Sequence, residues 1–269
     1  MNTERGNIPF RINVKGVTVE SFEQLYYNIE MNKGLDFITP KDAHSGKLAI
    51  VGGGSSLSNN IIDLKEWNDN IWSINKTHDW LYQHGILSTF VTVDAEPNLK
   101  FYPSREHVNN SLFASHCDPV LVRSYRNAKL FHMSPLVVSG VHGGSSTAVS
   151  MAFVALSMGY RDITFYGCES SLGNTSHIDR NDDLPNQMII RANGEEFTTT
   201  PSLYCQVQEL SRLVKFKPEW FKQKCGGLFE AMIKDDNWEI VAVSEQLKFH
   251  LEELNGKCGL FDLPYVRKS

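Results

Sequence analysis

Two segments rich in glycine and serine are the residues of this 269-residue chain best suited to hold a phosphate group. The first is Gly52-Gly53-Gly54-Ser55-Ser56, which follows the apolar run 48–51. The second is Gly143-Gly144-Ser145-Ser146, which opens a stretch of small and apolar residues. Glycine lets the backbone approach a bound group closely, and the amides at a helix N-terminus attract anions. Both segments therefore predict phosphate-binding loops; a tight packing turn is the alternative interpretation of each.

Carboxylates and a histidine could supply metal binding and proton transfer. Asp94 and Glu96 follow the apolar stretch 89–93, and paired hard oxygen ligands suit Mg²⁺ held through substrate phosphates. The alternative is a helix cap beside a solvated carboxylate. Glu169 could bind a ribose hydroxyl or a metal, or lie solvated in a loop. His177 could act as a general base or bind a phosphate near neutral pH, although a loop histidine is often simply solvated.

Short apolar runs alternate with helical patterns from residue 47 onward, which predicts a parallel sheet with helices on both faces. We expect a Rossmann-like, doubly wound α/β fold. Predicted strands cover 48–51, 71–74, 89–93, 112–115, 129–133, 163–166 and 240–243, and predicted helices cover 21–29, 79–84, 145–158, 201–214 and 244–254. Ligands of such sheets bind beyond the carboxyl ends of the strands. Asn75 and Thr77 after the second strand, and His116 after the fourth, should therefore join Asp94 and Glu169 at one crevice.

The chain is predicted to have a helical N-terminal extension over 1–46, a Rossmann-like core over 47–215 and a C-terminal α/β extension over 216–269. Residues 170–200 are polar with little periodicity, so we expect a long loop there that serves as a lid or binding loop.

Composition excludes several classes of protein. The 31 acidic and 26 basic residues give a net charge of −5, which argues against a general nucleic-acid footprint. No apolar run approaches the roughly 20 residues that span a membrane, and the first residues do not resemble a signal peptide. The five cysteines are odd in number and form no CxxC pair, which favours a reducing, cytoplasmic location. A homo-oligomer is compatible with these features.

Six motifs in order resemble the 6-hydroxymethylpterin pyrophosphokinase MptE-like family. They are LAIVGGGSSL, IWSINKTHDWLYQHGI, FVTVDAEP, SLFASHCDP, GGSSTAVSMAFVALSMGYRDITFYGCESS and SHID, within residues 47–180. The later stretch FTTTPSLYCQVQEL is similar to the tail of bacterial and phage members. The resemblance implies a Rossmann-like enzyme that transfers diphosphate from ATP to a hydroxymethyl group with Mg²⁺. By position, Gly52–Ser56 would hold phosphates, Asn75 would contact the nucleotide, Asp94 would lie at the metal, and Gly144–Ser146 would line the donor site.

The sequence departs from the family pattern in two places. Its first loop lacks the commoner proline, and Glu169 stands where aspartate is expected. The pattern also resembles bacterial sialyltransferases that use a cytidine-monophosphate sugar, in which a histidine at a position like that of His177 acts as the base. We therefore expect a nucleotide-dependent transferase. The alternatives are a glycosyltransferase that uses a nucleotide sugar, and a non-catalytic module that binds a nucleotide or a nucleotide-derived signal.

Overall fold

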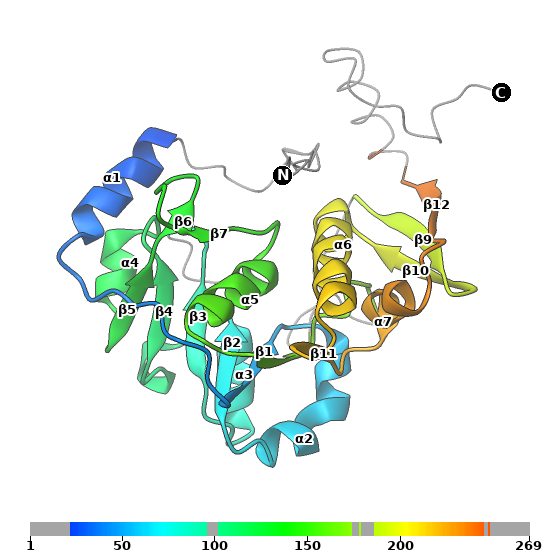
Figure 1. Ribbon diagram of the computed structural model, residues 1–269, viewed down its shortest axis with the longest axis horizontal. Coiled ribbons are helices and arrows are strands. Elements are labelled where there is room, and N and C mark those ends of the chain that lie inside the picture. Colours follow the sequence, from blue (N-terminus) through cyan, green and yellow to red (C-terminus); the bar gives the residue numbers. More distant parts are fainter. Residues whose placement is uncertain (1–21, 96–101, 174–177, 179–185, 245–246, 248–269) are drawn as a thin grey trace.

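The computed structural model describes residues 22–95, 102–173, 178, 186–244 and 247 (Figure 1). Within these residues the largest element is a seven-stranded parallel sheet with strand order β11-β8-β1-β2-β3-β4-β5. Its strands are β1 (Lys47–Val51), β2 (Asn70–Ile74), β3 (Thr89–Thr92), β4 (Ser111–Ala114), β5 (Ala128–Phe131), β8 (Asp162–Tyr166) and β11 (Phe221–Gln223). The predicted doubly wound α/β fold is confirmed.

Helices lie on both sides of this sheet (Figure 1). They are α1 (Phe22–Asn32), α2 (Ile61–Lys65), α3 (Thr77–Gln83), α4 (Pro119–Arg123), α5 (Thr147–Ser157), α6 (Pro201–Phe216) and α7 (Gly227–Lys234), with 3-10 helices η1 (Ser55–Asn60) and η3 (Arg105–His107). None of the helices in the described residues combines the length and hydrophobicity needed to cross a bilayer.

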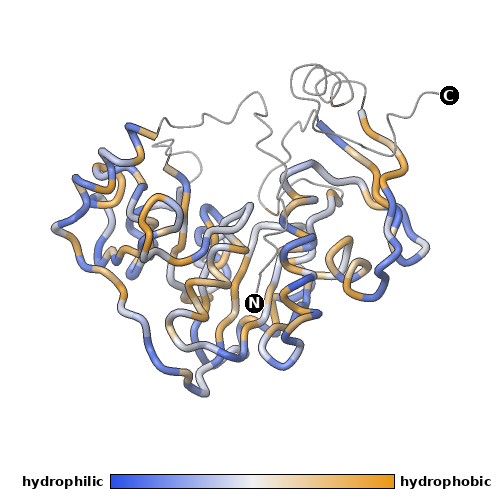
Figure 2. The backbone as a smooth tube through the Cα atoms, turned by 45° about the horizontal axis from the view of Figure 1, so that its top comes forward, coloured by the Kyte–Doolittle hydropathy of each residue, from blue (hydrophilic) through white to orange (hydrophobic). Residues whose placement is uncertain are grey.

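The central strands are apolar on both faces because both faces are covered. In β1, Leu48 and Ile50 pack in one hydrophobic cluster, while Ala49 and Val51 pack in a second. All four side chains are fully buried. Figure 2 shows the same arrangement, with hydrophobic stretches running through the interior. A continuous apolar run of this kind is typical of a parallel strand between two helical layers.

The strand order places a topological switch point between β1 and β8. The chain runs outward from β1 to β5 on one side, then returns so that β8 pairs with β1 on the other. Val51, the last residue of β1, lies opposite Tyr166 at the end of β8 and Ser73 near the end of β2. Ligands of open α/β sheets bind in the crevice at such a point.

The prediction of a long loop over 170–200 is wrong for its second half. Residues 188–199 form a hairpin of β9 (Met188–Ala192) and β10 (Glu195–Thr199), and β12 (Glu239–Val243) adds a third antiparallel strand. Asn193 and Gly194 link β9 to β10 with φ values of 51° and 79°. An Asn-Gly pair with positive φ at both positions is the favoured two-residue hairpin turn. A further short pair is formed by β6 (Met133–Ser134) and β7 (Val141–His142).

Both predicted extensions contribute to the central sheet or its edge. β11, from the predicted C-terminal extension, pairs in parallel with β8. Near the N-terminus, Phe37 forms a parallel bridge with Leu130 of the edge strand β5. The helix predicted for 244–254 lies outside the described residues except at 244 and 247.

Candidate functional site at the carboxyl edge of the sheet

The first Gly/Ser loop is in direct backbone contact with the loop that follows β8. The Gly52 amide donates to the Tyr166 carbonyl at 2.8 Å, and the Gly54 amide donates to the Gly167 carbonyl at 2.9 Å. A Cβ atom on Gly52 would lie 2.5 Å from the Gly167 oxygen, so the approach requires glycine. The Ile178 amide also donates to the Gly53 carbonyl at 2.8 Å. Three segments therefore meet at the switch point.

The donors of this loop surround a carboxylate of the protein itself. Glu169 Oε1 accepts from the Ser56 amide at 2.8 Å and from Ser55 Oγ at 3.2 Å, and Oε2 accepts from Ser56 Oγ at 2.7 Å. Glu169 is only 5% exposed. A Cβ on Gly54 would lie 2.1–2.4 Å from the Glu169 carboxyl group, so the missing side chain makes room for that group. The loop has the geometry of an anion site, and Glu169 is the anion in it.

The second Gly/Ser loop is arranged in the same way. Glu209 of α6 accepts from the Ser145 amide at 2.8 Å and from Ser145 Oγ at 2.6 Å, both through Oε2. The Ser146 side chain caps α5 by accepting from the Val149 amide, and the Gly144 amide donates to Ser150 Oγ at 3.2 Å. Gly144 and Ser146 thus contact α5, whereas the Ser145 amide and hydroxyl donate to the Glu209 carboxylate of α6.

Asn75 and Asp94 are brought together at the ends of β2 and β3. Asn75 has a φ of 50° and donates from Nδ2 to Asp94 Oδ2 at 2.7 Å. Thr92 Oγ1 lies 3.4 Å from the same oxygen and accepts from the Asp94 amide at 3.1 Å. These contacts fix the orientation of the Asp94 carboxylate at the carboxyl edge. Thr77 is the buried first residue of α3, which begins two residues after Asn75.

His116 joins this group through the backbone of Val93. Its Nε2 lies 2.8 Å from the Val93 carbonyl oxygen, one residue before Asp94. Burial lowers the pKa of His116, and the hydrogen bond to Val93 offsets this in part. The turn that carries His116 is held by two asparagines of α1. Asn28 Nδ2 donates to the His116 carbonyl at 2.9 Å, and Asn32 Nδ2 donates to the Ser115 and Cys117 carbonyls at 3.0 and 2.9 Å.

Sequence reasoning missed this role of α1. The apolar spacing of the helix suggests an apolar buried face, yet Phe22 and Tyr26 are about half exposed while Asn28 and Asn32 are buried. Ile29 of the predicted apolar face is buried as expected, and the signal for the buried asparagines was their spacing at i and i+4, which places two amides on one side of the helix.

The family profile described as "6-hydroxymethylpterin diphosphokinase MptE-like" matches residues 21–175, more than half of the chain. The chain belongs to the MptE-like family. The match begins at residue 21 and so includes α1, which holds the His116 turn.

One solved structure shares the fold of this MptE-like chain. It is the MAf glycosyltransferase from Magnetospirillum magneticum AMB-1, with 12% sequence identity and a TM-score of 0.55. The match covers 87% of this chain but only 42% of the MAf chain, so the likeness concerns less than half of that protein. No match among curated proteins reaches significance.

Two predicted site residues of the MptE-like chain, Glu96 and His177, lie outside the described residues. Within the described ranges, no cluster of three or more His, Cys, Asp or Glu side chains is placed to hold a metal ion. Asp94 is the predicted metal ligand that the structure describes. One carboxylate is compatible with Mg²⁺, which usually takes one or two carboxylates together with substrate phosphates and waters.

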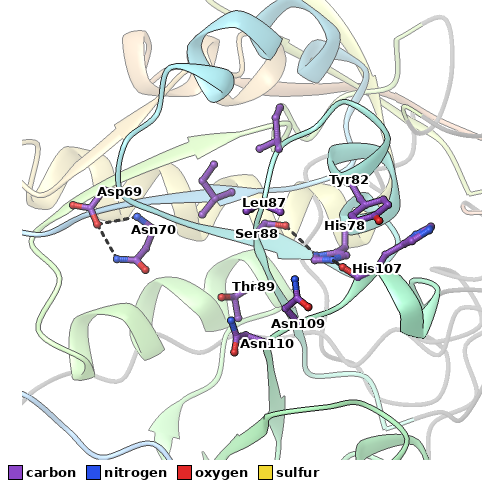
Figure 3. A pocket seen from close by; sticks show the side chains of 12 residues that line it. Asp69, Asn70, His78, Tyr82, Leu87, Ser88, Thr89, His107, Asn109 and Asn110 are labelled. Carbon is purple, nitrogen blue, oxygen red and sulfur yellow. Dashed lines mark hydrogen bonds between the residues drawn. The ribbon is translucent and has the colours of Figure 1, made fainter.

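A pocket at the opposite edge of the sheet is separate from the predicted site (Figure 3). It lies at the amino ends of β2 and β3, where Asn70 and Thr89 line it. His78 contributes to its wall and contacts Ser88 Oγ at 3.0 Å, while His107 Nδ1 contacts Asp79 at 2.7 Å. Burial lowers the pKa of His78. His78 Nδ1 also lies 2.9 Å from Ser73 Oγ of β2, and its Nε2 lies 3.0 Å from the His107 carbonyl oxygen, so the network joins β2, α3 and η3.

Proposed function

We propose that this chain is a group transferase that binds a nucleotide-containing donor beyond the carboxyl ends of β1, β2, β3 and β8. Membership in the MptE-like family supports a transferase role. The observation that carries the proposal is the convergence of strand ends: Ser56 contacts Glu169, and Asn75 holds Asp94. These contacts place polar groups at the carboxyl ends of four neighbouring strands, the edge at which α/β sheets bind their ligands.

The reaction that the family description suggests is diphosphate transfer. The acceptor hydroxyl oxygen would bond to the β-phosphorus of ATP while the bond from that phosphorus to AMP breaks, and the hydroxyl proton would pass to a base. In this proposal Asp94 would hold Mg²⁺, and the ion would supply charge that neutralises the donor phosphates. Asn75 orients Asp94 through the 2.7 Å hydrogen bond. His177 remains our predicted base.

The Glu169 carboxylate imposes a condition on phosphate binding in the first loop. A phosphate placed among the Ser55 and Ser56 donors would meet the Glu169 charge at hydrogen-bond range, and like charges at such distances repel. A phosphate therefore enters this loop only when Glu169 withdraws from it or when a cation lies between the two anions.

A second candidate is transfer of a sugar from a nucleotide sugar. The observation that favours it is that both Gly/Ser loops already hold a carboxylate, Glu169 in one and Glu209 in the other. A triphosphate brings more negative charge to these loops than a nucleotide monophosphate sugar does, so the arrangement suits the less charged donor better. The MAf glycosyltransferase, which shares the fold, is named for this class of reaction.

A melting-temperature panel tests the proposal. The protein is heated with ATP, GTP, CTP, a cytidine-monophosphate sugar or S-adenosylmethionine, each with and without Mg²⁺. A specific ligand at about 100 times its Kd adds roughly 2.7 kcal/mol, which is about 5–11 °C for a domain of this size. We expect a shift with a nucleotide or nucleotide sugar, and we expect Asp94→Ala to abolish the Mg²⁺-dependent part. A panel without any shift would overturn the proposal, and tight binding of a ligand recovered unchanged with every acceptor would indicate a binding module.

A further inference from the structure

Five buried side-chain atoms have no hydrogen-bond partner among the residues that the structure describes, and two of them belong to residues that come just after β2 and β4. These two are Nδ1 of His116 and Oδ1 of Asn75. His116 is 8% exposed, and Asn75 is half-buried. An unsatisfied buried polar atom destabilises a protein by about 1–3 kcal/mol, so native structures hold few of them. Two at one edge of the sheet indicate that a ligand supplies the missing donors.

The protonation of His116 follows from its contacts. Nε2 faces the Val93 carbonyl, which can only accept, so Nε2 carries the hydrogen and Nδ1 presents a lone pair. Burial keeps the ring neutral by lowering its pKa. The bonds from Asn28 and Asn32 to the surrounding carbonyls hold the turn in place. Nδ1 of His116 is therefore an acceptor at a fixed position.

The orientation of the Asn75 amide is fixed by the same reasoning. Its partner at 2.7 Å is a carboxylate oxygen of Asp94, which accepts, so the atom facing it is the Nδ2 donor. Oδ1 of Asn75 is then the acceptor that lacks a donor. Val93 and Asp94 are consecutive residues, so the His116 and Asn75 contacts meet at the end of β3 from the two flanking strands.

The chemistry of these atoms selects the kind of group that can satisfy them. Phosphate oxygens are acceptors and would leave both atoms unsatisfied, whereas a sugar hydroxyl can donate. Carboxylates at strand ends of related α/β folds bind ribose hydroxyls in this manner. The Asp94 carboxylate beside Asn75 adds further acceptors to the same edge, which also favours a group that can donate hydrogen bonds.

We propose that His116 and Asn75 are specificity-determining residues that accept hydrogen bonds from hydroxyl groups of a sugar moiety in the ligand. The inference rests on the proposed function, because it assigns one part of the nucleotide-containing donor to the ends of β2–β4. The phosphates would then lie between this sugar site and the two loops that meet at the ends of β1 and β8, so that an ion held by Asp94 can still neutralise them.

The test is a calorimetric titration of ATP and CTP, with and without Mg²⁺, each compared with its 2′,3′-dideoxy form. The wild-type protein should bind at least one ribonucleotide about tenfold more tightly than the dideoxy form, as expected for a lost neutral hydrogen bond that leaves a buried acceptor unpaired. His116→Gln keeps a donor for the Val93 carbonyl but has no acceptor at the place of Nδ1. It should bind the ribonucleotide about tenfold more weakly and the dideoxy form with unchanged affinity.

Two further variants control this result. His116→Asn places an amide oxygen near the position of Nδ1, and it should restore part of the preference for the ribonucleotide. His132→Gln changes the histidine that follows β5, whose Nδ1 contacts Ser115 Oγ at 2.9 Å, and it should leave the preference intact.

The outcomes separate the inference from the proposed function. Wild-type binding without any difference between ribo and dideoxy forms would overturn the inference alone. If His116→Gln weakened the affinity for the ribonucleotide and the dideoxy form equally, or weakened it only in the presence of Mg²⁺, that result would also overturn the inference. Absence of any nucleotide or nucleotide-sugar binding to the wild-type protein would overturn the proposed function, and the inference with it.

Discussion

Replacing Gly54 with alanine tests whether Glu169 occupies the first Gly/Ser loop. The backbone at Gly54 has φ −71° and ψ 158°, a conformation open to alanine. The new Cβ would lie 2.1 Å from Oε2, 2.3 Å from Cδ and 2.4 Å from Oε1 of Glu169. Real contacts of this kind are never so short, so the carboxyl group must leave the loop.

The expected loss follows from the hydrogen bonds that Glu169 gives up. Two are short and involve a charged acceptor, at 2.7 and 2.8 Å, and the third is 3.2 Å long. With about 1.5 kcal/mol for each short bond, Gly54→Ala should destabilise the protein by roughly 3 kcal/mol. For a domain of this size that is a fall in Tm of about 6–12 °C.

The same substitution should no longer destabilise the protein when the Glu169 side chain has been removed. In a Glu169→Ala background the clash disappears, and Gly54→Ala should be neutral or stabilise by about 0.4–1 kcal/mol because it restricts the unfolded chain. Thermal or urea unfolding of the four proteins in this double-mutant cycle measures the coupling. Gly34→Ala is a matched control, since a Cβ there meets nothing within 4 Å. Equal destabilisation by Gly54→Ala in both backgrounds would refute the assignment.

Three further predictions concern the surroundings of the site. Asn32→Ala removes two buried hydrogen bonds to backbone carbonyls and should lower stability by about 2–3 kcal/mol in urea unfolding; a change below 0.5 kcal/mol would contradict the role of α1. Glu209→Gln removes only the charge from the half-buried acceptor of Ser145, so the free energy of unfolding should fall by no more than about 1 kcal/mol, and a larger loss would contradict this prediction. The pKa of His78 is lowered in the folded protein, so as the pH falls His78 is protonated at a higher pH in the unfolded chain than in the folded protein. The contribution of His78 to the free energy of unfolding should therefore be complete above about pH 6.5 and be lost below it. Between pH 7.5 and 5 the stability of His78→Gln should fall less than that of the wild type, and parallel plots of stability against pH for the two proteins would exclude this contribution.

Six of the seven strands of the central sheet could be predicted because each is a short apolar run followed by polar residues, whereas the three-residue strand β11 was not predicted. The residues 48–51, 71–74 and 163–166 lie in β1, β2 and β8 as expected. The alternation of patterns predicted a parallel sheet with polar strand ends at one edge, and in the structure Asn75 and Asp94 follow the neighbouring strands β2 and β3. Local sequence was sufficient at these positions because both the strand and its polar end are continuous in the chain.

The hairpin over 188–199 could also have been predicted from local sequence. The Asn193-Gly194 pair is a strong turn signal between two strand-like segments, but the many polar residues of the region favoured a loop interpretation. The charged strand Glu195–Thr199 pairs with β9, whose other side is covered by β12, so the tertiary contacts outweigh its low hydrophobicity.

The partners of the two Gly/Ser loops could not have been predicted in this way. Glu169 is 113 residues from Ser56, and Glu209 is 64 residues from Ser145. A loop of glycine and serine amides attracts any anion, and the sequence does not reveal whether a ligand or a distant side chain supplies it. The burial of Asn28 and Asn32 in α1 is a similar case, since only the tertiary contact with the turn after β4 explains it.

The location of the donor is the central claim, and a calorimetric titration with site variants tests it most directly. With the nucleotide or nucleotide sugar that shifts the Tm most, Kd is measured for the wild type, for Asp94→Ala and Asn75→Ala at the carboxyl edge, and for Asn110→Ala in the pocket at the amino edge. We predict that each carboxyl-edge variant weakens binding at least tenfold and that Asn110→Ala leaves it unchanged. Unchanged binding by Asp94→Ala and Asn75→Ala, with a loss in Asn110→Ala, would contradict the account.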